Sequence, residues 1–314
     1  MKCLVSGATG FIGRLLCQQL ADRGDTVIPL SRSGSPLPDG TPTLARDLAA
    51  GDLEPDLLRG VEVVFHLAGI AHQRAGPEAY RQVNHLATLA LARAAEAAGV
   101  RCFVFLSSVK AMGPPPGDAQ RSEEDCRPPA DDYGRSKWRA ECGLREAFAN
   151  SAMAVVILRP ALVYGQGAKG NIDLLAKAVR LGLPRPPDLG GRSMIAREDL
   201  VALLLHVADH PPPGVHTWIA SDGRCYSSRY LYDLLRRSAG RRVGTDWLPA
   251  WGWRLAAAAL DRLRPHPGES TWDKLFGTEL YSNRAVLAAT GWRPTLTLEA
   301  SLGGHSGASG RWRS

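Results

Sequence analysis

The first half of the chain alternates short, almost wholly apolar runs with longer stretches in which apolar residues recur every three or four positions. An apolar run without polar alternation is typical of a parallel strand covered on both faces, and the longer pattern predicts an amphipathic helix. The expected strands are residues 2–7, 26–31, 61–67, 101–108 and 154–160. The expected helices are residues 13–24, 83–99 and 134–150. This alternation predicts an α/β fold with a doubly wound parallel sheet.

After Tyr164 the pattern becomes less regular, because loops rich in glycine and proline separate the apolar segments. The expected elements of this half are a strand at residues 214–220 and helices at 172–181, 198–209 and 227–239. We therefore predict a first domain of residues 1–165, a smaller α/β lobe that takes up most of residues 166–302, and a disordered tail at 303–314. The apolar segment 251–263 is short and carries arginines, which favours a packed helix over the open alternative of a helix that touches a membrane surface.

Composition narrows the class of protein further. The chain has 314 residues, of which 45% are hydrophobic and 22% charged, as in ordinary globular proteins. No run is long and apolar enough for a membrane span, and the chain opens on an apolar strand instead of a signal peptide, so we expect a cytoplasmic protein. Six cysteines without a CxxC pair suit a reducing compartment. The sequence shows no cluster with metal-ligand spacing.

The net charge of +7 raises the question of a nucleic-acid partner. The arginines are scattered, with no basic helix and no aromatic stacking motif, so we expect no nucleic-acid binding. A basic balance suits an anionic small molecule equally well.

Three glycines stand in the stretch "SGATGFIG", directly after the first expected strand. Gly7 permits a tight turn, Gly10 lets the backbone approach a pyrophosphate, and Gly13 allows the helix to pack closely on the strand. The amides at the start of the helix then face the anion. Because further strand–helix units follow, we favour a dinucleotide site over a glycine turn without a ligand.

The stretch "YGRSK" places Tyr133 and Lys137 four residues apart, on one face of a helix. A phenol with a reference pKa of about 10 exchanges protons poorly at neutral pH. A nearby ammonium would stabilise the phenolate, which suits proton transfer to an oxygen while hydride moves at its carbon. Ser108 follows a strand and could hydrogen-bond the same oxygen. Taken singly, each residue could equally be a solvated helix face or a turn former.

The order of these motifs resembles that of extended short-chain dehydrogenases/reductases of the nucleotide-sugar epimerase/dehydratase type. The resemblance covers about residues 1–300 and rests on "GATGFIG", "HLAG" (66–69), "QVNHLAT", "LSSVKAMG" (106–113), "YGRSK" (133–137) and "LRPALVYG" (158–165). It implies an enzyme with a Rossmann-like domain for NAD(P) and a C-terminal lobe for the substrate. It also implies that Ser108, Tyr133 and Lys137 are catalytic, with Lys137 holding the nicotinamide ribose as well.

The resemblance extends to further contacts with the two ligands. Besides the glycines, Tyr133 and Lys137, the implied cofactor contacts are Thr9, Phe11, Ile12, Asp47, Leu48, Leu67, Ala68, Gly69, Asn84 and Pro160. The implied substrate contacts are Ser108, Lys110, Asn171 and Arg192. A planar guanidinium such as Arg192 is suited to a diphosphate, although a surface arginine would look the same in sequence. Arg46 stands where the family usually has glycine, next to Asp47.

The second expected strand ends in Ser31 and Arg32, where an acidic residue usually holds the ribose of NAD. Without a carboxylate, nothing there repels a 2′-phosphate, and Arg32 could pair with it. We therefore favour NADP(H) over NAD(H), although Arg32 could also be an exposed loop residue. An epimerase keeps its NAD bound, whereas a reductase consumes a fresh hydride in each turnover.

The leading hypothesis is NADPH-dependent reduction of a 4-keto nucleotide sugar of the UDP-4-keto-6-deoxy-hexosamine type, in surface-polysaccharide synthesis. Three alternatives stay open. They are a UDP-hexose or UDP-N-acetylhexosamine 4-epimerase with bound NAD, a reductase of a non-nucleotide ketone, and a non-catalytic NADP sensor. The resemblance also implies a possible homodimer through residues 83–99 and 134–150.

Overall fold

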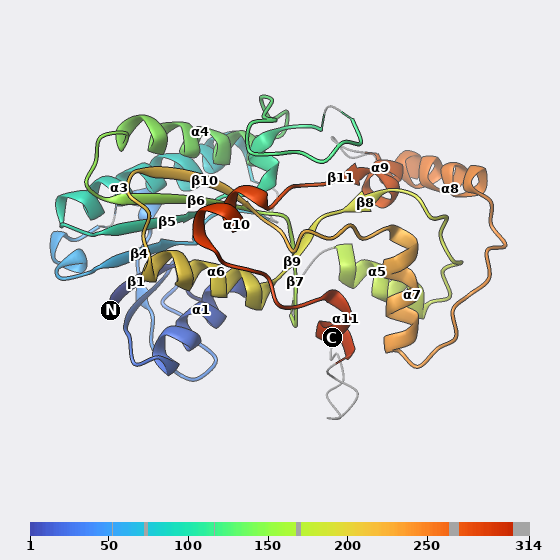
Figure 1. Ribbon diagram of the computed structural model, residues 1–314, viewed down its shortest axis with the longest axis horizontal. Coiled ribbons are helices and arrows are strands. Elements are labelled where there is room, and N and C mark those ends of the chain that lie inside the picture. Colours follow the sequence, from blue (N-terminus) through green and yellow to red (C-terminus); the bar gives the residue numbers. More distant parts are fainter. Residues whose placement is uncertain (52, 72–74, 116, 168–170, 264–269, 304–314) are drawn as a thin grey trace.

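The computed structural model describes residues 1–51, 53–71, 75–115, 117–167, 171–263 and 270–303, and Figure 1 shows how the elements are arranged. Within these residues the central sheet has seven parallel strands in the order β10-β6-β5-β4-β1-β2-β3. They are β1 (Lys2–Ser6), β2 (Thr26–Ser31), β3 (Leu44–Ala45), β4 (Val63–His66), β5 (Cys102–Leu106), β6 (Ala154–Pro160) and β10 (Val215–Ala220). The expected Rossmann-like doubly wound sheet is confirmed.

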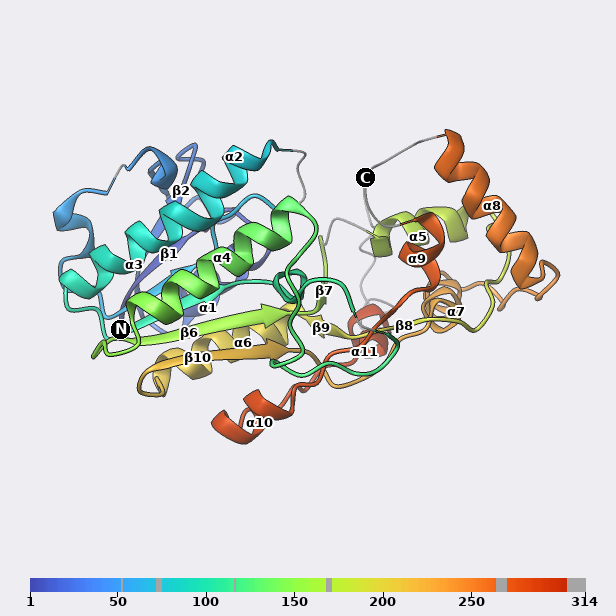
Figure 2. The same cartoon turned by 90° about the horizontal axis from the view of Figure 1, so that it is seen from above.

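Helices cover both faces of the sheet, which is why its strands are apolar throughout (Figure 2). Every residue of β5 and β6 is buried. One face packs against α1 (Phe11–Asp22) and α6 (Arg197–Asp209). The other packs against α3 (Ala87–Ala97) and α4 (Asp132–Ala147). Shorter helical segments precede some of these helices: η1 (Leu48–Ala50), η2 (Pro55–Leu58), α2 (Pro77–Tyr80), η3 (Arg81–Leu86) and η4 (Val109–Met112).

The strand order reverses between β1 and β4. From β1 the chain builds outward through β2 and β3, and it then returns to place β4, β5, β6 and β10 on the other side. In an open α/β sheet, ligands bind in the crevice outside the carboxyl ends of the strands at this switch point. The glycine stretch follows β1 and "HLAG" begins at the end of β4, so both lie there.

The second lobe differs from its expected extent. The segments expected as helix 198–209 and strand 214–220 return to the first domain, where α6 packs on α1 and β10 pairs with β6. Without β10 the fully buried strand β6 would form an open edge, so the sheet recruits a strand from beyond residue 165. Both elements therefore pack with the first domain although they follow residue 165 in the chain.

The remaining elements of the C-terminal half are mostly short. They are β7 (Leu162–Tyr164), α5 (Asn171–Arg180), β8 (Gly191–Arg192), β9 (Met194–Ala196), α7 (Ser228–Ser238), α8 (Ala250–Leu263), α9 (Thr271–Phe276), β11 (Thr278–Glu279), α10 (Arg284–Thr290) and α11 (Leu298–Gly303). A small core that includes Tyr164, Tyr226, Leu231 and Leu298 holds this lobe together. No described helix is both long and apolar enough to span a bilayer.

Candidate active site

The glycine turn leaves no room for side chains at two of its positions. Gly7 has a φ of +73°, and a Cβ there would lie 2.8 Å from the backbone nitrogen of Ala68. A Cβ on Gly13 would lie 2.2 Å from the Gly7 carbonyl oxygen. Gly10 is exposed at the start of α1, and no side chain caps the first amides of that helix. The turn therefore presents bare helix amides beside the loop after β4, as a pyrophosphate site requires.

The residues around this turn lie as follows. Thr9, Phe11 and Ile12 are half-buried at the start of α1. Leu67 and Ala68 are half-buried in the loop after β4, and Gly69 in that loop is exposed. Thus the candidate cofactor residues of both segments meet at the switch point between β1 and β4.

Asn84 fixes the loop after β4. Its side-chain oxygen accepts a hydrogen bond from the Ile70 amide at 2.8 Å, and its amide nitrogen donates to the Ile70 carbonyl at 2.9 Å and to Ser136 Oγ at 3.0 Å. Asn84 is fully buried in the π-helical segment η3. Such an insertion in a helix is frequent at functional sites. Asn84 thus joins the loop of Gly69 to helix α4.

His66 forms a buried network that the sequence did not reveal. Its Nδ1 lies 2.6 Å from Ser6 Oγ and its Nε2 lies 2.9 Å from Thr88 Oγ1. Burial, and to a lesser extent the positive charge of Lys137, together lower the pKa of His66 to about 3, so the ring is neutral. The network ties β1, β4 and α3 together beneath the glycine turn. The only signal in the sequence is a polar residue at the end of an apolar strand.

Ser108 and Lys137 both lie at the end of β5, and Tyr133 forms a side-chain hydrogen bond with Ser108. Ser108 caps η4, where its Oγ accepts from the Lys110 amide at 3.2 Å. Lys137 is buried on α4, and its Nζ donates to the Leu106 carbonyl at 2.9 Å. A Cβ on Gly69 would lie 3.2 Å from that Nζ, so Lys137 also borders the loop after β4.

The ionisation of Tyr133 and Lys137 is set by their surroundings. Burial raises the pKa of Tyr133, and a hydrogen bond with Ser108 and the positive charge of Lys110 oppose that rise. Burial lowers the pKa of Lys137 to about 8, while the negative charge of Glu141 opposes the fall. Tyr133 therefore keeps its proton at neutral pH, and Lys137 is still mostly cationic there. The protonated phenol can donate a proton, but its pKa is raised by burial and not lowered toward neutrality, as the ammonium one helical turn away led us to expect.

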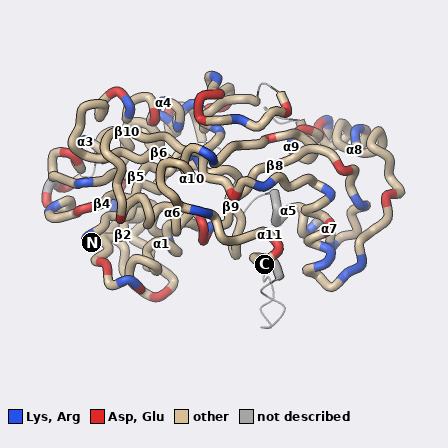
Figure 3. Tube along the Cα trace, viewed as in Figure 1, with Lys and Arg blue, Asp and Glu red and all other residues tan. Residues whose placement is uncertain are grey.

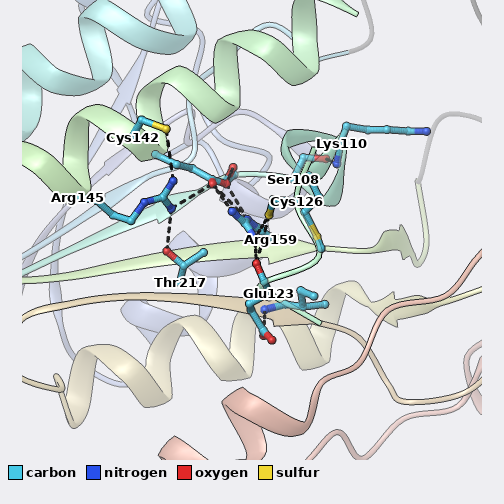
Figure 4. Close-up of polar contacts among 12 residues, drawn as sticks. Ser108, Lys110, Glu123, Cys126, Cys142, Arg145, Arg159 and Thr217 are labelled. Atoms are coloured by element: carbon cyan, nitrogen blue, oxygen red, sulfur yellow. Dashed lines mark hydrogen bonds and ion pairs between the residues drawn. The ribbon is translucent and has the colours of Figure 1, made fainter. Parts of the chain in front are cut away.

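Glu141 of α4 and Arg159 of β6 form a buried ion pair, and Figure 4 shows Arg159 with its polar contacts. Glu141, one turn after Lys137 on α4, accepts from Ser107 Oγ at 2.5 Å and from Arg159 Nη2 at 2.6 Å. Glu141 is completely buried and the Arg159 side chain is 3% exposed. Arg159 also donates to the Glu123 carbonyl at 3.1 Å. The pair thus joins β6 to helix α4, which carries Tyr133, and through Ser107 to the segment that carries Ser108.

The two cations expected to contact the substrate share one carboxylate. Figure 4 shows the Lys110 side chain pointing away from Ser108. Lys110 Nζ lies 2.8 Å from one oxygen of Glu279, and Arg192 Nη1 lies 3.0 Å from the other. Burial acts to raise the pKa of Glu279, but the positive charges of Lys110 and Arg192 outweigh burial and lower this pKa, so the carboxylate is ionised. The sequence did not indicate Glu279. Asn171 begins α5, and its side chain lies outside the described part of the structure.

The adenine end of the predicted site lies beyond β2. Ser31 is buried and its Oγ lies 2.7 Å from Thr43 Oγ1. Arg32 is exposed. Asp47 is exposed and accepts from the Ala49 amide at 3.0 Å, and the half-buried Leu48 packs on the core. Pro160 is the buried last residue of β6. These positions place the predicted cofactor contacts along the carboxyl edge of the sheet.

A doubly wound sheet with a bare glycine turn at its switch point defines a class of dinucleotide-binding enzymes. The sequence profile described as "NAD dependent epimerase/dehydratase family" matches residues 3–219, and the chain belongs to this family. It is therefore an extended short-chain dehydrogenase/reductase of the nucleotide-sugar type, as the sequence motifs implied.

Individual relatives include both epimerases and reductases. The chain is 31% identical to a UDP-glucose 4-epimerase of Vibrio cholerae, over 94% of this chain and 92% of that protein. It is 33% identical to a UDP-2-acetamido-2,6-beta-L-arabino-hexul-4-ose reductase of Pseudomonas aeruginosa, over 55% of this chain and 38% of that protein. The solved structure of MoeE5 in complex with UDP-glucose and NAD is 26% identical, covers 96% of both chains and has a TM-score of 0.76.

Proposed function

We propose that the chain reduces the ketone of a 4-keto nucleotide sugar with NADPH. The observation that carries this proposal is the end of β2, where an exposed Arg32 follows Ser31 and neither residue is acidic. A strand end without a carboxylate favours a dinucleotide that carries a 2′-phosphate. This dinucleotide is NADPH, which is the usual hydride donor of reductases. The Pseudomonas aeruginosa relative, named as a 4-ketose reductase, supports the same reaction class.

The Gly7–Gly13 turn would hold the pyrophosphate, and the nicotinamide, when bound, supplies the hydride. Ser108 would hold the ketone oxygen by a hydrogen bond. Tyr133 would donate its proton to that oxygen as the carbonyl carbon is reduced. Lys137 would hold the nicotinamide ribose and keep a positive charge beside the phenol. The hydrogen bond between Tyr133 and Ser108, and the position of Lys137 at the end of β5, support these roles.

Lys110 and Arg192 are proposed as substrate contacts that are exchanged on binding. Both now pair with Glu279. A diphosphate carries the same sign of charge as this carboxylate and offers more acceptor oxygens, so it would compete with Glu279 for the two cations. In this proposal Glu279 keeps the cations in place before the nucleotide sugar arrives.

Stopped-flow absorbance of the nicotinamide tests the reaction. With purified protein and a UDP-4-keto-6-deoxy-hexosamine, we expect NADPH to be oxidised at the rate at which the 4-hydroxy sugar forms. The competing function is 4-epimerisation with bound NAD, which the Vibrio cholerae relative favours. Interconversion of UDP-GlcNAc and UDP-GalNAc without NADPH oxidation would establish the epimerase instead.

Arg32 should decide which dinucleotide is preferred. Replacing it with alanine removes the proposed partner of the 2′-phosphate, a charge-assisted hydrogen bond that contributes about 1.5–3 kcal/mol. We expect NADPH binding to weaken by about ten- to a hundred-fold while NADH binding changes little. Fluorescence titration of both dinucleotides measures this, with exposed Arg14→Ala on α1 as the control. Equal losses for both would contradict the assignment.

The alkaline limit of the reaction should follow Lys137. Its pKa in the folded protein is lowered to about 8, so its positive charge is complete below that pH and is lost as the pH rises through it. We expect kcat/KM to be level near neutrality and to fall by about tenfold per pH unit above pH 8. Thermal unfolding at each pH checks that the protein stays folded. A rate that stays level beyond pH 10 would show that the charge is not needed.

A homodimer through α3 and α4 is also proposed. A groove of about 510 Å³ runs between these helices and is lined by side chains of both, including Leu89, Arg93, Arg139 and Glu146. Its mixture of apolar and oppositely charged side chains suits a self-complementary contact across a twofold axis. Light scattering of the native protein and of Leu89→Asp measures the oligomeric state.

A further inference from the structure

Helix α8 leaves a large apolar surface in solvent. Trp251, Leu255 and Leu263 on this helix are 67%, 64% and 78% exposed, and Trp247 just before it is 69% exposed. Monomeric proteins seldom expose tryptophan and leucine in such a group without a partner. We call Trp247, Trp251, Leu255 and Leu263 the α8 face.

Among the described residues, helix α8 packs through the side that carries its two buried residues. Trp253 and Ala257 are its buried residues, and the ring of Trp253 meets that of Phe276 of α9 edge-on at 5.7 Å. At 100° per residue, Trp251 and Leu255 project from the opposite side of α8. The packing against α9 thus fixes the orientation of the helix and turns the α8 face outward.

The exposed charged residues of the described helix α8 are all positive. The exposed charged residues of α8 are Arg254 and Arg262. Its one acidic residue, Asp261, is half-buried and accepts from the Thr271 amide at 3.0 Å. Arg262 falls on the same side of the helix as Trp251. Within the described helix, therefore, the apolar surface is accompanied by positive charge alone.

The segment that leads into α8 adds to this charge. Arg241 and Arg242 are exposed there, and Figure 3 shows basic positions gathered along α7 and the following loop. Asp246 in the same loop is neutralised by Arg185 at 3.2 Å and Arg229 at 2.8 Å. Arg241, in contrast, donates to the Arg180 carbonyl at 3.1 Å, and a bond to this neutral group leaves its positive charge in place.

We propose that the α8 face docks this lobe on a bilayer that contains anionic lipids. Tryptophan and leucine on one side of a helix, with arginines beside them, are the features of a helix that lies in the membrane interface. A second copy of the chain fits less well, because a twofold contact would bring Arg262 of both copies together with no exposed carboxylate on the described helix to pair with them. Figure 1 shows α8 at the end of the molecule remote from the sheet, so docking leaves the carboxyl edge of the sheet accessible.

This proposal is independent of the reaction, and vesicle co-sedimentation of the full chain tests it. We expect the protein to pellet with vesicles of phosphatidylcholine mixed with phosphatidylglycerol, and much less with phosphatidylcholine alone. Trp251→Ser combined with Leu255→Ser should lower the bound fraction at least about tenfold, since it removes the apolar anchor. Arg262→Gln should weaken binding to the anionic vesicles only. Leu44→Ser, an exposed leucine in β3, is the matched control and should bind as the native chain does.

Three results would overturn the proposal. The first is failure of the native protein to bind anionic vesicles, and the second is unchanged binding by the folded Trp251→Ser/Leu255→Ser variant. The third is a dimer in light scattering that the same variant abolishes, without vesicle binding, which would make the α8 face a contact between copies. Circular dichroism and NADPH titration of each variant verify that it is folded.

Discussion

Replacing Tyr133 with phenylalanine is expected to slow NADPH oxidation by about 10²–10⁴-fold, the range that positioned proton donors contribute. The substitution removes the phenolic hydroxyl and its hydrogen bond with Ser108 and keeps the ring. Because Lys137 holds its own bond to the Leu106 carbonyl, the dinucleotide site should survive. We therefore expect NADPH binding within about twofold of native, so that the loss falls on kcat.

Tyr80 supplies the control for this experiment. Its ring lies 6.3 Å from that of Tyr133, and it is buried in the helical turn before η3. Tyr80→Phe makes the same chemical change beside the site, without removing the proposed proton donor, and should keep most of the rate. If Tyr133→Phe reduces the ketone as fast as the native enzyme, the proton comes from another group and the proposed mechanism is wrong.

The sheet could be predicted because each of its strands is a local apolar run. Strands covered on both faces, such as β5 and β6, need no knowledge of their neighbours to be found. Which strands share a sheet is a different matter. Strand β10 is separated from β6 by the first part of the second lobe, and nothing in its own sequence says that it returns to the first domain. Its place beside β6 follows from the unpaired edge that β6 would otherwise have, which only the folded sheet reveals.

Some residues of the candidate site could likewise be found from local sequence, and others could not. Gly7 and Gly13 could be recognised in the sequence, because only glycine fits at positions where a Cβ would clash with backbone atoms. Glu141 could have been suspected, since it follows Lys137 by one helical turn. Glu279 could not, because its partners Lys110 and Arg192 come from distant segments and meet it only in the folded chain. Sequence motifs thus located the two cations but not the carboxylate that holds them.

Replacing Glu141 with glutamine is expected to destabilise the protein by about 3–5 kcal/mol, the cost of leaving one member of a buried ion pair without its partner. Glutamine has nearly the same shape and can still accept from Ser107, so the loss reports the charge. Arg159 would remain buried and charged, with neutral acceptors in place of the carboxylate: the amide oxygen of the glutamine, the Glu123 carbonyl and the Cys126 sulfur. Urea unfolding measures the change in free energy.

Two further variants separate charge from packing. Adding Arg159→Met to Glu141→Gln removes the orphaned cation, so we expect the double variant to regain most of the lost stability. Arg145→Gln removes a more exposed arginine, 3.4 Å from Glu141, and should cost less than about 1 kcal/mol. Equal losses in the single and double variants would show that packing, and not the buried charge, dominates at this position.

The same substitution should also move the pH profile. The negative charge of Glu141 opposes the fall in the pKa of Lys137, so without it that pKa drops below about 8. The ammonium is then lost at lower pH, and the alkaline fall in kcat/KM should begin closer to neutrality. The double variant Glu141→Gln/Arg159→Met removes both charges of the pair. Its alkaline fall in kcat/KM should begin at a pH between those of the native protein and of Glu141→Gln. A stability loss without any shift of the profile would mean that Glu141 holds the fold together but leaves the charge on Lys137 unaffected.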